Sequence, residues 1–508
     1  MLWSLSSRLI DGLPRLGWIA STSRGSTLVE LLHGKDVEVG PTWAVEGVWD
    51  GPFADGEFER SLVFFGTGLK LLNNGVVFAT SRDCIGRLFY CEIGAERFVS
   101  NSLLLLLART GARLDTHHLY VDENVPALHG VDDLMDTIRI VHPRCHTFRL
   151  QIYNNLSLTA LGFTSQRVDS LSSPSSYDGY RNGIRAIMEG IGRNMRAPER
   201  RSPMAAYATM STGYDSSAAT ALARPLGIEC AYTSKTSSSA VPRLLRPSLI
   251  DDDATDIGRS LGIEMRALEP IDAGDPTDDE VYFLAVNRSD SEAALMSMTR
   301  DIAGSGKVGV VCTGYHGDNA WGRTTDDETR GRRFVRSSTS GQSLLEIRLH
   351  AGFVNLPVPF LYCADPFALA VISNAAEMAP WQLNNDYDRP IPRRVLEEAG
   401  VPREAFGWAK KGLAKYRALP QTRHLRNEFC SFVGLSPRVV QAITATDRLL
   451  YLGSRGAVYA AHVGNRQRAL HTFTSRDPLG ERLKLGSQML CWAADRLAAK
   501  YQTVITAL

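Results

Sequence analysis

The strongest constraint on the fold is a strand, turn and helix pattern near the middle of the chain. Residues 204–210 form an apolar run (MAAYATM), residues 211–216 read STGYDS, and residues 218–222 are again apolar. A glycine-containing turn between a strand and a helix gathers backbone N–H groups at one point, where the helix N-terminus favours an anion. Asp215 would repel a phosphate unless a divalent cation lay between them. The segment therefore predicts a nucleotide site with Mg²⁺, although the same pattern is also typical of a plain N-cap and turn.

A second segment also places an acidic residue in a loop directly after a strand. The apolar run 308–312 leads into TGYHGDNAWGR at 313–323, which places Asp318 just after a strand. Ligands of open α/β sheets bind at the carboxyl ends of the strands, so Asp215 and Asp318 on neighbouring strands could share one metal–pyrophosphate group. The chain has neither the G-x-x-x-x-G-K-[ST] loop nor a G-x-G-x-x-G fingerprint, which argues against kinase-like and dehydrogenase-like functions.

The two halves of the chain have different patterns. Residues 27–161 show short alternating runs broken by glycine turns, which predict a sheet sandwich with a helix at 102–107. Residues 165–176 are polar and serine-rich and predict a linker. From an amphipathic helix at 177–195 onward, strands and helices alternate, which predicts a parallel sheet with helices on both faces. Helices are also expected at 252–261 and 291–303.

The two strand-end motifs resemble those of the asparagine-synthetase superfamily. Residues 211–216 resemble its S-G-G-x-D-S pyrophosphate loop, and residues 313–322 resemble its S-G-E-G-S-D-E-x-F-G segment. The likeness covers about 177–415. It implies an α/β protein in which residues 177–508 form an ATP-dependent synthetase domain with a parallel sheet of the adenine-nucleotide α-hydrolase-like kind. The residues implied to bind ATP and Mg²⁺ are Ser211, Thr212, Gly213, Tyr214, Asp215, Ser216 and Gly314 for the nucleotide, and Asp215 and Asp318 for the metal.

The N-terminal half resembles the glutaminase-like domain of the same superfamily. The segment 82–90 (RDCIGRLFY) is similar to the second half of that domain, so residues 1–168 are expected to form an Ntn-hydrolase-like sandwich. Glutamine-dependent members carry a nucleophilic cysteine directly after the initiator methionine, whereas Leu2 stands here and no cysteine precedes Cys84. The resemblance therefore implies a degenerate domain without glutamine hydrolysis.

A further departure points to a narrower group. Tyr315 replaces the glutamate of S-G-E-G, as in β-lactam and carbapenam synthetases, where the tyrosine pairs with a downstream glutamate to deprotonate the attacking amine; lasso-peptide cyclases share the overall chemistry. Glu346 is the expected partner, although an ion pair with Arg348 on a helix surface is an equally plain interpretation. Lys410, or its neighbour Lys411, resembles the lysine that stabilises the charge on the oxyanion and the leaving phosphate.

The sequence allows two interpretations for each of two other groups of residues. His316 is expected either to contact substrate or to be a hydrogen-bonded loop histidine. The arginines that follow this loop are expected either to face pyrophosphate or an acidic substrate, or to lie on a solvated loop; they are Arg330, Arg332, Arg333 and Arg336.

The resemblance implies ATP-dependent activation of a substrate carboxylate as an acyl-adenylate, with release of pyrophosphate, and then attack by an amine to give an amide or lactam. The substrate would be a small molecule or a peptide with a carboxylate and an amine. Alternatives are activation of another carbonyl for nitrogen or sulfur transfer, and a non-catalytic scaffold. Residues 442–508 carry no readable motif and are expected to cap the synthetase half or to mediate assembly, as a homodimer or with a partner enzyme.

Composition limits the class of protein and the compartment in which we expect it. The net charge of +1 argues against binding nucleic acid or membrane by bulk charge. The longest strongly apolar run, 103–107, is far shorter than the ~20 residues of a spanning helix. Eight scattered cysteines without a C-x-x-C pair predict reduced thiols and a cytoplasmic protein.

Overall fold

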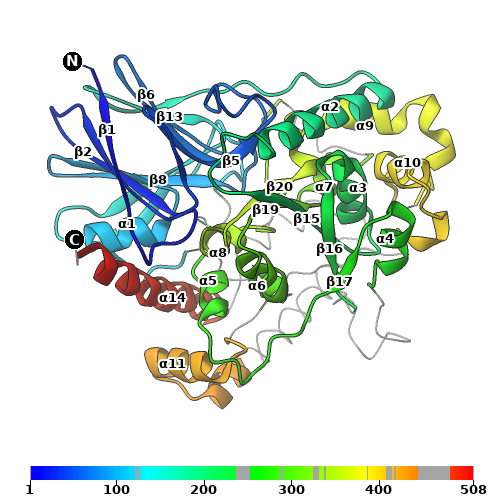
Figure 1. Ribbon diagram of the computed structural model, residues 1–508. Coiled ribbons are helices and arrows are strands. Elements are labelled where there is room, and N and C mark those ends of the chain that lie inside the picture. The colour runs from blue at the N-terminus through cyan, green and yellow to red at the C-terminus, as the bar shows by residue number, and fades with distance from the viewer. Residues whose placement is uncertain are drawn as a thin grey trace.

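The computed structural model describes residues 2–120, 123, 126–235, 252–286, 290–323, 331–336, 339–385, 387–407, 415–416, 419–443 and 481–506. Antiparallel strands of the N-terminal third lie at one side of the molecule, and a parallel sheet flanked by helices lies at the other (Figure 1). The expected α/β architecture, with both antiparallel and parallel sheets, is confirmed at this level.

Two sheets make up the N-terminal third. The first has the order β1 (Ser4–Leu9), β3 (Leu28–His33), β2 (Trp18–Ser23), β9 (Glu96–Ser100), β8 (Arg87–Ile93), β12 (Thr147–Ile152), β11 (Thr137–Val141) and β10 (Arg113–Leu114). The second has the order β14 (Gly162–Gln166), β13 (Asn155–Thr159), β7 (Gly75–Ala79), β6 (Phe64–Leu72), β5 (Trp43–Trp49) and β4 (Glu38–Val39). The paired strands run antiparallel except for β1 and β3, which are parallel.

The two sheets pack face to face, as the alternating pattern predicts. One apolar cluster contains side chains of both sheets, and Trp18 of β2 stacks on Phe78 of β7 with ring centroids 6.3 Å apart. Helix α1 (Leu103–Thr110) begins at Ser102, whose side chain accepts a hydrogen bond from the N–H of Leu105, and ends at Gly111, which has a left-handed backbone. The five consecutive leucines at the start of α1 are all buried, which explains why this part of the helix has no polar residue.

The parallel sheet has the order β17 (Met265–Ala267), β16 (Ile228–Thr233), β15 (Met204–Met210), β19 (Val308–Thr313) and β20 (Phe353–Pro357). The helices of this half are α2 (Tyr177–Met195), α3 (Tyr214–Ala223), α4 (Thr255–Leu261), α5 (Asp279–Leu284), α6 (Met296–Gly304), α7 (Gly317–Ala320), α8 (Leu344–Ala351), α9 (Pro366–Asn374), α10 (Pro390–Glu398) and α11 (Arg423–Val433). A short strand β18 (Asp290–Ser291) pairs with β21 (Lys415–Tyr416). The chain moves from β15 through α3 to β16 and through α4 to β17, and then returns to β19 on the other side of β15.

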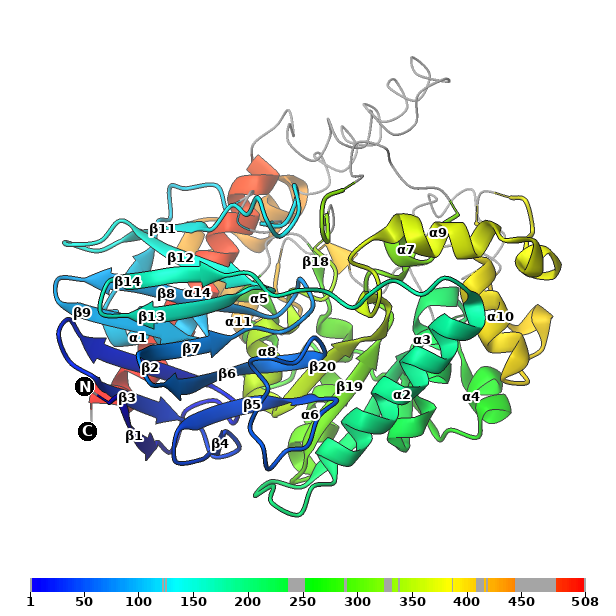
Figure 2. The same cartoon turned by 90° about the horizontal axis from the view of Figure 1, so that it is seen from above.

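The strand order therefore reverses between β15 and β19. Parallel crossovers of one hand then place α3 and α4 on one face of the sheet and α6 and α8 on the opposite face (Figure 2). A reversal of this kind opens a crevice at the carboxyl ends of the two central strands, where ligands of doubly wound sheets bind. The two segments singled out in the sequence both follow these two strands.

Most predicted elements are confirmed. The helix expected at 177–195 is α2, and the strands expected at 204–210 and 308–312 are β15 and β19. The helix expected at 291–303 is shorter, because β18 and a 3-10 turn over Ala293–Leu295 precede α6. The expected linker begins two residues late, since β14 extends to Gln166, and no helix or strand covers 167–176.

The two halves of the chain are joined by α8 and by the C-terminal helix α14 (Glu481–Thr506). Arg348 of α8 donates to both carboxylate oxygens of Glu46 in β5, at 2.8 and 3.0 Å, and both side chains are buried. Helix α14 packs against α1 and β10 (Figure 1). Helix α14 also packs against α5 and α11 of the second half, so the described part of the tail 442–508, which was expected to cap that half or to mediate assembly, contacts both halves.

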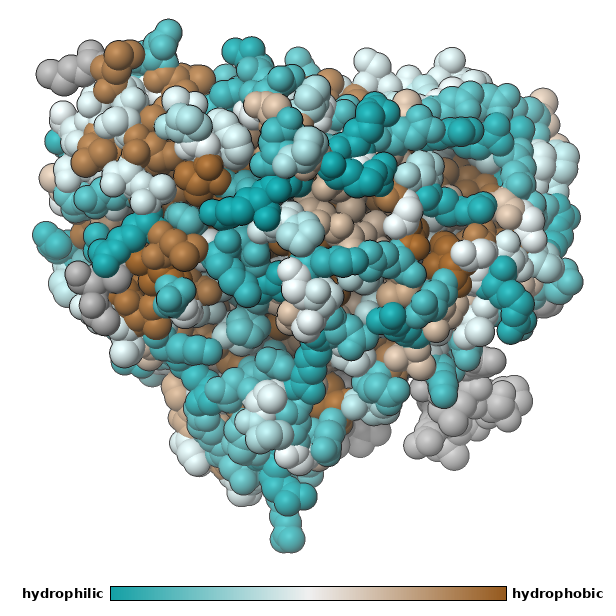
Figure 3. All heavy atoms as spheres, viewed as in Figure 1, coloured by the Kyte–Doolittle hydropathy of each residue, from teal (hydrophilic) through white to brown (hydrophobic). Residues whose placement is uncertain are grey.

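The surface is mostly hydrophilic. Apolar residues on the visible face gather over the N-terminal strands, and smaller groups lie elsewhere on this face (Figure 3). Leu9 of β1 and Leu28 of β3 are half exposed. Within the part of the chain that the structure describes, none of the helices combines the length and the apolar character that crossing a bilayer requires. All eight cysteines carry free thiols.

Candidate functional site

The first strand end is a turn held by its own serines. Helix α3 begins at Tyr214 with Gly213 as its N-cap. The hydroxyl groups of Ser211 and Ser216 share a hydrogen bond of 2.8 Å, and the Gly213 N–H donates to Ser211 Oγ at 3.2 Å. The first N–H groups of a helix have no partner in the helix's own hydrogen-bond ladder, so a helix start with hydroxyl groups beside it is a place where an anion can bind.

The same turn is anchored by an acidic residue that the sequence analysis missed. Both the N–H and the hydroxyl of Thr212 donate to Asp252 Oδ1, at 3.1 Å each. Asp252 is buried and lies just before α4. The side chain of Thr212, predicted to contact the nucleotide, therefore fastens the loop to the neighbouring βα unit. No motif around Asp252 indicates this contact.

The side chain of Tyr214, also predicted to belong to the nucleotide site, packs in the interior. Its side chain is fully buried, its hydroxyl accepts a hydrogen bond from Arg393 Nη2, and its ring lies 4.9 Å from that of Tyr387. This places the side chain between α3 and α10. Only the backbone of Tyr214 belongs to the start of α3.

The second strand end presses directly on the first. A Cβ at Gly314 would lie 2.4 Å from both the carbonyl carbon of Asp215 and the nitrogen of Ser216, and a Cβ at Gly317 would lie 2.6 Å from the carboxyl carbon of Asp215. Both distances are far inside van der Waals contact. Glycine at 314 is thus a requirement of close approach, and the predicted convergence of the two segments is present in the structure.

The two carboxylates predicted to bind the metal lie on this shared edge. Asp215 is in the first turn of α3 and Asp318 is in the first turn of the short helix α7, with Gly317 packed between them. Arg389 forms an ion pair with Asp215, with 2.9 Å between Nη1 and Oδ1. Arg389, which stands just before α10, was not predicted as a site residue. It supplies positive charge at the 211–216 loop.

The structure does not bring Glu346 to Tyr315. The carboxylate of Glu346 accepts hydrogen bonds from Ser102 Oγ at 2.6 Å and from the Leu103 N–H at 2.9 Å, so it caps helix α1 of the N-terminal half. Burial raises the pKa of Glu346 to about 7, although these hydrogen bonds lower it. Glu346 is also not an exposed partner of Arg348, which pairs with Glu46 instead. The predicted Tyr315–Glu346 pair is therefore absent.

A different acid lies near Tyr315. Gly341 packs on the Tyr315 ring, since a Cβ there would lie 2.9 Å from the ring edge, and the Gly341 N–H donates to Glu292 Oε1 at 2.7 Å. The preceding carbonyl, Ser340 O, accepts from Arg336 Nη2 at 2.7 Å. Burial first, and the Glu292 charge second, raise the pKa of Tyr315 well above its usual value, whereas the Arg336 charge lowers it.

Two of the arginines predicted after this loop are not solvated. Arg336 is 1 % exposed and also donates to the Cys84 carbonyl of the N-terminal half. Arg333 donates to Asp132 Oδ1 at 2.6 Å and to a backbone carbonyl at 2.7 Å. Arg330, Lys410 and Lys411 lie outside the described residues.

His316 is a buried ring at the mouth of β19. It has a left-handed backbone with φ of 74°, and its ring stacks on Phe360 with centroids 4.5 Å apart. Burial and the nearby Arg336 charge lower the pKa of His316 to about 3, so its imidazole is neutral at physiological pH. It can serve as a hydrogen-bonding group but not as a cation.

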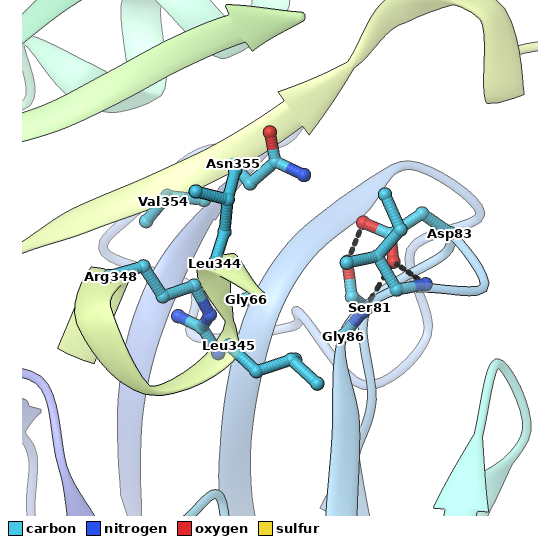
Figure 4. Close-up of a pocket in the computed structure, with 10 residues that line it drawn as sticks. Gly66, Ser81, Asp83, Gly86, Leu344, Leu345, Arg348, Val354 and Asn355 are labelled. Atoms are coloured by element: carbon cyan, nitrogen blue, oxygen red, sulfur yellow. Dashed lines mark hydrogen bonds between the residues drawn. The ribbon is translucent and has the colours of Figure 1, made fainter. Parts of the chain in front are cut away.

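The segment 82–90, which resembles part of a glutaminase-like domain, forms a loop over residues 82–86 and the first residues of β8. The Asp83 carboxylate accepts from the N–H groups of Ile85 and Gly86, at 2.7 and 2.6 Å, and from Ser81 Oγ at 2.7 Å. A small cavity beside it is closed on the other side by α8 and β20 (Figure 4) and has room for roughly one water molecule. Asp83 is thus satisfied within its own turn.

Among the described residues, no group of three or more histidine, cysteine, aspartate and glutamate side chains is arranged to hold a metal ion. A Mg²⁺ ion bound with a nucleotide needs only one or two protein carboxylates, because the phosphates supply further ligands. A comparison with protein-family models finds no match to this chain, and a search of curated proteins finds no relative.

Proposed function

We propose that this protein is an ATP-dependent synthetase of the asparagine-synthetase superfamily. It activates a substrate carboxylate as an acyl-adenylate with release of pyrophosphate, and an amine then displaces AMP to give an amide or lactam. The observation that carries the proposal is the close contact of the 211–216 loop with the 314–318 segment at the reversal point of the parallel sheet. A serine-rich anion loop and two carboxylates there suit a magnesium-bound pyrophosphate group.

The residues present fit ATP and Mg²⁺. Ser211, Ser216 and the first N–H groups of α3 would hold pyrophosphate oxygens, and Asp215 and Asp318 would hold Mg²⁺, which neutralises the charge of the phosphates. Gly314 lets the two segments approach without a side chain between them. Arg389 is paired with Asp215 in the structure. When Mg²⁺ binds Asp215, the Arg389 side chain would turn to the phosphates.

The second step needs an amine held beside the acyl-adenylate. The C–N bond forms as the C–O bond to AMP breaks, the electron pair of the C–O bond leaves on the phosphate of AMP, and the proton lost by the nitrogen passes to water. Tyr315 stands one residue beyond Gly314 and is the side chain proposed to orient the amine. Lys410, with Lys411 as the alternative, remains the proposed cation for the developing oxyanion.

The N-terminal half is proposed to be a degenerate glutaminase-like domain, residues 1–168, attached to a synthetase domain, residues 177–508. The two-sheet sandwich of the N-terminal third supports this. Without glutamine hydrolysis, the nucleophile is an amine of the substrate itself or of a second substrate. The substrate class is a small molecule or a peptide with a carboxylate and an amine.

The test is exchange of labelled pyrophosphate into ATP, measured with Mg²⁺ and a panel of amino acids and peptides. Exchange with at least one carboxylate is expected for the wild type and is expected to be lost in Asp215→Asn. The matched control is Asp256→Asn, which makes the same change in the first turn of α4, where the side chain is 80 % exposed. Equal exchange in both variants would remove Asp215 from the site, and failure of the wild type both to exchange and to bind MgATP would refute the proposal.

A further inference from the structure

Two buried arginines, one from each half of the chain, meet at the loop that precedes β8. Arg87 Nε donates to the Ile85 carbonyl at 3.4 Å, and Arg336 Nη1 donates to the neighbouring carbonyl, that of Cys84, at 3.3 Å. Arg87 is 4 % exposed and Arg336 is 1 % exposed. The positive charge of Arg336 lowers the pKa of Arg87, in addition to the larger effect of burial. Two cations are therefore held near each other and away from solvent.

Each of these guanidinium groups has a nitrogen whose hydrogen no protein atom accepts. Arg87 Nη2 and Arg336 Nε are both buried and have no hydrogen-bond partner in the protein. Neither arginine forms an ion pair with a carboxylate of the residues that the structure describes. Arginine is rarely buried without a partner, because the charge and the unaccepted N–H group both lose their hydration. The pair therefore calls for a further ligand.

Arg82 shows how the same loop satisfies a buried arginine with protein oxygens alone. Its three nitrogens donate to four backbone carbonyls and to the side-chain oxygen of Asn155. A guanidinium has five N–H donors, so each of them can have an acceptor there. The fold thus supplies a full set of oxygens to Arg82 and leaves the sets of Arg87 and Arg336 incomplete.

The carboxylates nearest to the two arginines are engaged elsewhere. The charge of Asp83 acts on both arginines, and the charges of Glu292 and Asp318 act on Arg336. Asp83 accepts three hydrogen bonds within its own turn, and Glu292 accepts the N–H of Gly341. Asp318 is exposed on α7, at the proposed metal site. These acids offset part of the cost of burying two cations, but they do not accept the two remaining N–H groups.

We propose that Arg87 Nη2 and Arg336 Nε together bind one small anion, a halide, which is chloride under physiological conditions. A halide accepts hydrogen bonds from several directions and needs no path for further atoms. The cavity beside the same loop, lined in part by Ile85 and Gly86, has room for roughly one water molecule (Figure 4). Because protein covers both guanidinium groups almost completely, the place suits a monatomic ion rather than a phosphate or the carboxylate of a substrate.

The ion would fasten the two halves of the chain to each other. Arg87 begins β8 of the N-terminal sandwich, whereas Arg336 belongs to the segment before α8. Arg336 Nη2 also donates to the Ser340 carbonyl at 2.7 Å, and the next residue, Gly341, packs on the ring of Tyr315. Chloride would therefore stabilise the folded state and the wall of the candidate site. It takes no part in the proposed reaction, so this site stands or falls separately from the proposed function.

Crystals of the full-length protein grown in sodium bromide test the site directly, because bromide scatters anomalously and water does not. An anomalous difference peak is expected within hydrogen-bond distance of both Arg87 Nη2 and Arg336 Nε, and the peak should be lost in Arg87→Met. An ordered atom at this place without an anomalous signal would be water and would overturn the proposal. Bromide bound only at the protein surface would also overturn it.

Thermal unfolding tests whether the ion binds in solution. Potassium chloride is compared with potassium gluconate at the same concentration, which keeps the ionic strength constant. A ligand that binds only the folded state raises Tm, so the wild type should melt about 2 °C higher in about 100 mM chloride if chloride binds with a Kd of about 1 mM. Arg87→Met and Arg336→Met should lose this difference.

Arg333→Met is the matched control, because it removes the same charge from the segment of Arg336, but from an arginine that is paired with Asp132. It should keep both the bromide peak and the chloride-dependent rise in Tm. Equal melting of the wild type in the two salts, or a rise that persists in both Arg87→Met and Arg336→Met, would overturn the proposal. If neither of these two variants folds, the bromide peak of the wild type decides.

Discussion

Replacing Gly314 with alanine should damage the site through a steric clash alone. The added Cβ would lie 2.4 Å from two backbone atoms of the Asp215–Ser216 peptide and 2.6 Å from the Ser216 Cα. Ordinary carbon contacts are about 3.5–4.0 Å, so the start of α3 or the end of β19 must move by roughly 1 Å. Because all three atoms are backbone, no side-chain rotation can relieve the clash.

We expect this variant to lose about 1–3 kcal/mol of unfolding free energy, the usual cost of overpacking a well-packed region. MgATP affinity should fall by about 100-fold, since a shift of about 1 Å misplaces the phosphate donors. Urea denaturation and calorimetric titration with MgATP measure the two effects. The control is Gly304→Ala at the end of α6, where a Cβ meets nothing within 4 Å. If both alanine variants matched the wild type in stability and in affinity, the proposed contact between the two strand ends would be wrong.

Three further predictions concern contacts that hold the site in place. Because burial raises the pKa of Glu346 to about 7, the folded state binds this proton more tightly than the unfolded state does, so wild-type stability should decline as pH rises from about 4.5 to about 7. Glu346→Gln should remove that decline and, at about pH 8, exceed the wild type by about 3 kcal/mol, whereas parallel urea-denaturation profiles against pH would contradict the assignment. Asp252→Ala, which frees both donors of Thr212, should weaken MgATP binding in calorimetry more than Thr212→Ala does, and the reverse order would argue against the anchoring role. Arg348→Met should cost about 3–5 kcal/mol by leaving Glu46 buried and unpaired, and adding Glu46→Gln should restore part of it in urea denaturation; no recovery would show that the charge is not the cause.

The local parts of the site could be predicted from the sequence. The 211–216 turn lies between a strand and a helix that its own residues specify, and the same holds for the strand before Gly314. Their convergence followed from one rule, that the carboxyl ends of parallel strands share an edge. Patterns that depend only on neighbours along the chain were therefore reliable.

The partner of Tyr315 could not be predicted, because it depends on how helices face one another. Glu346 has a suitable position in the sequence, but the orientation of α8 turns its carboxylate to α1. Glu292 is 49 residues away from Gly341, whose N–H it accepts, and Gly341 packs on the Tyr315 ring. Arg336 was expected either to face an anion or to lie on a solvated loop, and its burial could not be predicted because the Cys84 carbonyl that accepts its hydrogen bond comes from a distant part of the chain.

The first strands were missed for a different reason. Strand β1 has almost no buried residue and contains three serines, so its sequence lacks the alternation of apolar and polar residues that indicates a half-buried strand. It is recognisable only through its pairing with β3. In the same way, the tail had no readable motif, although α14 buries an apolar stripe that includes Trp492 and Leu497.

The central claim is that a magnesium-bound triphosphate lies between the two strand ends, and a crystal structure with Mg²⁺ and a non-hydrolysable ATP analogue tests it most directly. We predict pyrophosphate oxygens at Ser211 and Ser216, the metal between Asp215 and Asp318, and Arg389 moved from its 2.9 Å contact with Asp215 toward the phosphates. A nucleotide bound elsewhere on the protein, with the Arg389–Asp215 ion pair intact, would contradict the account.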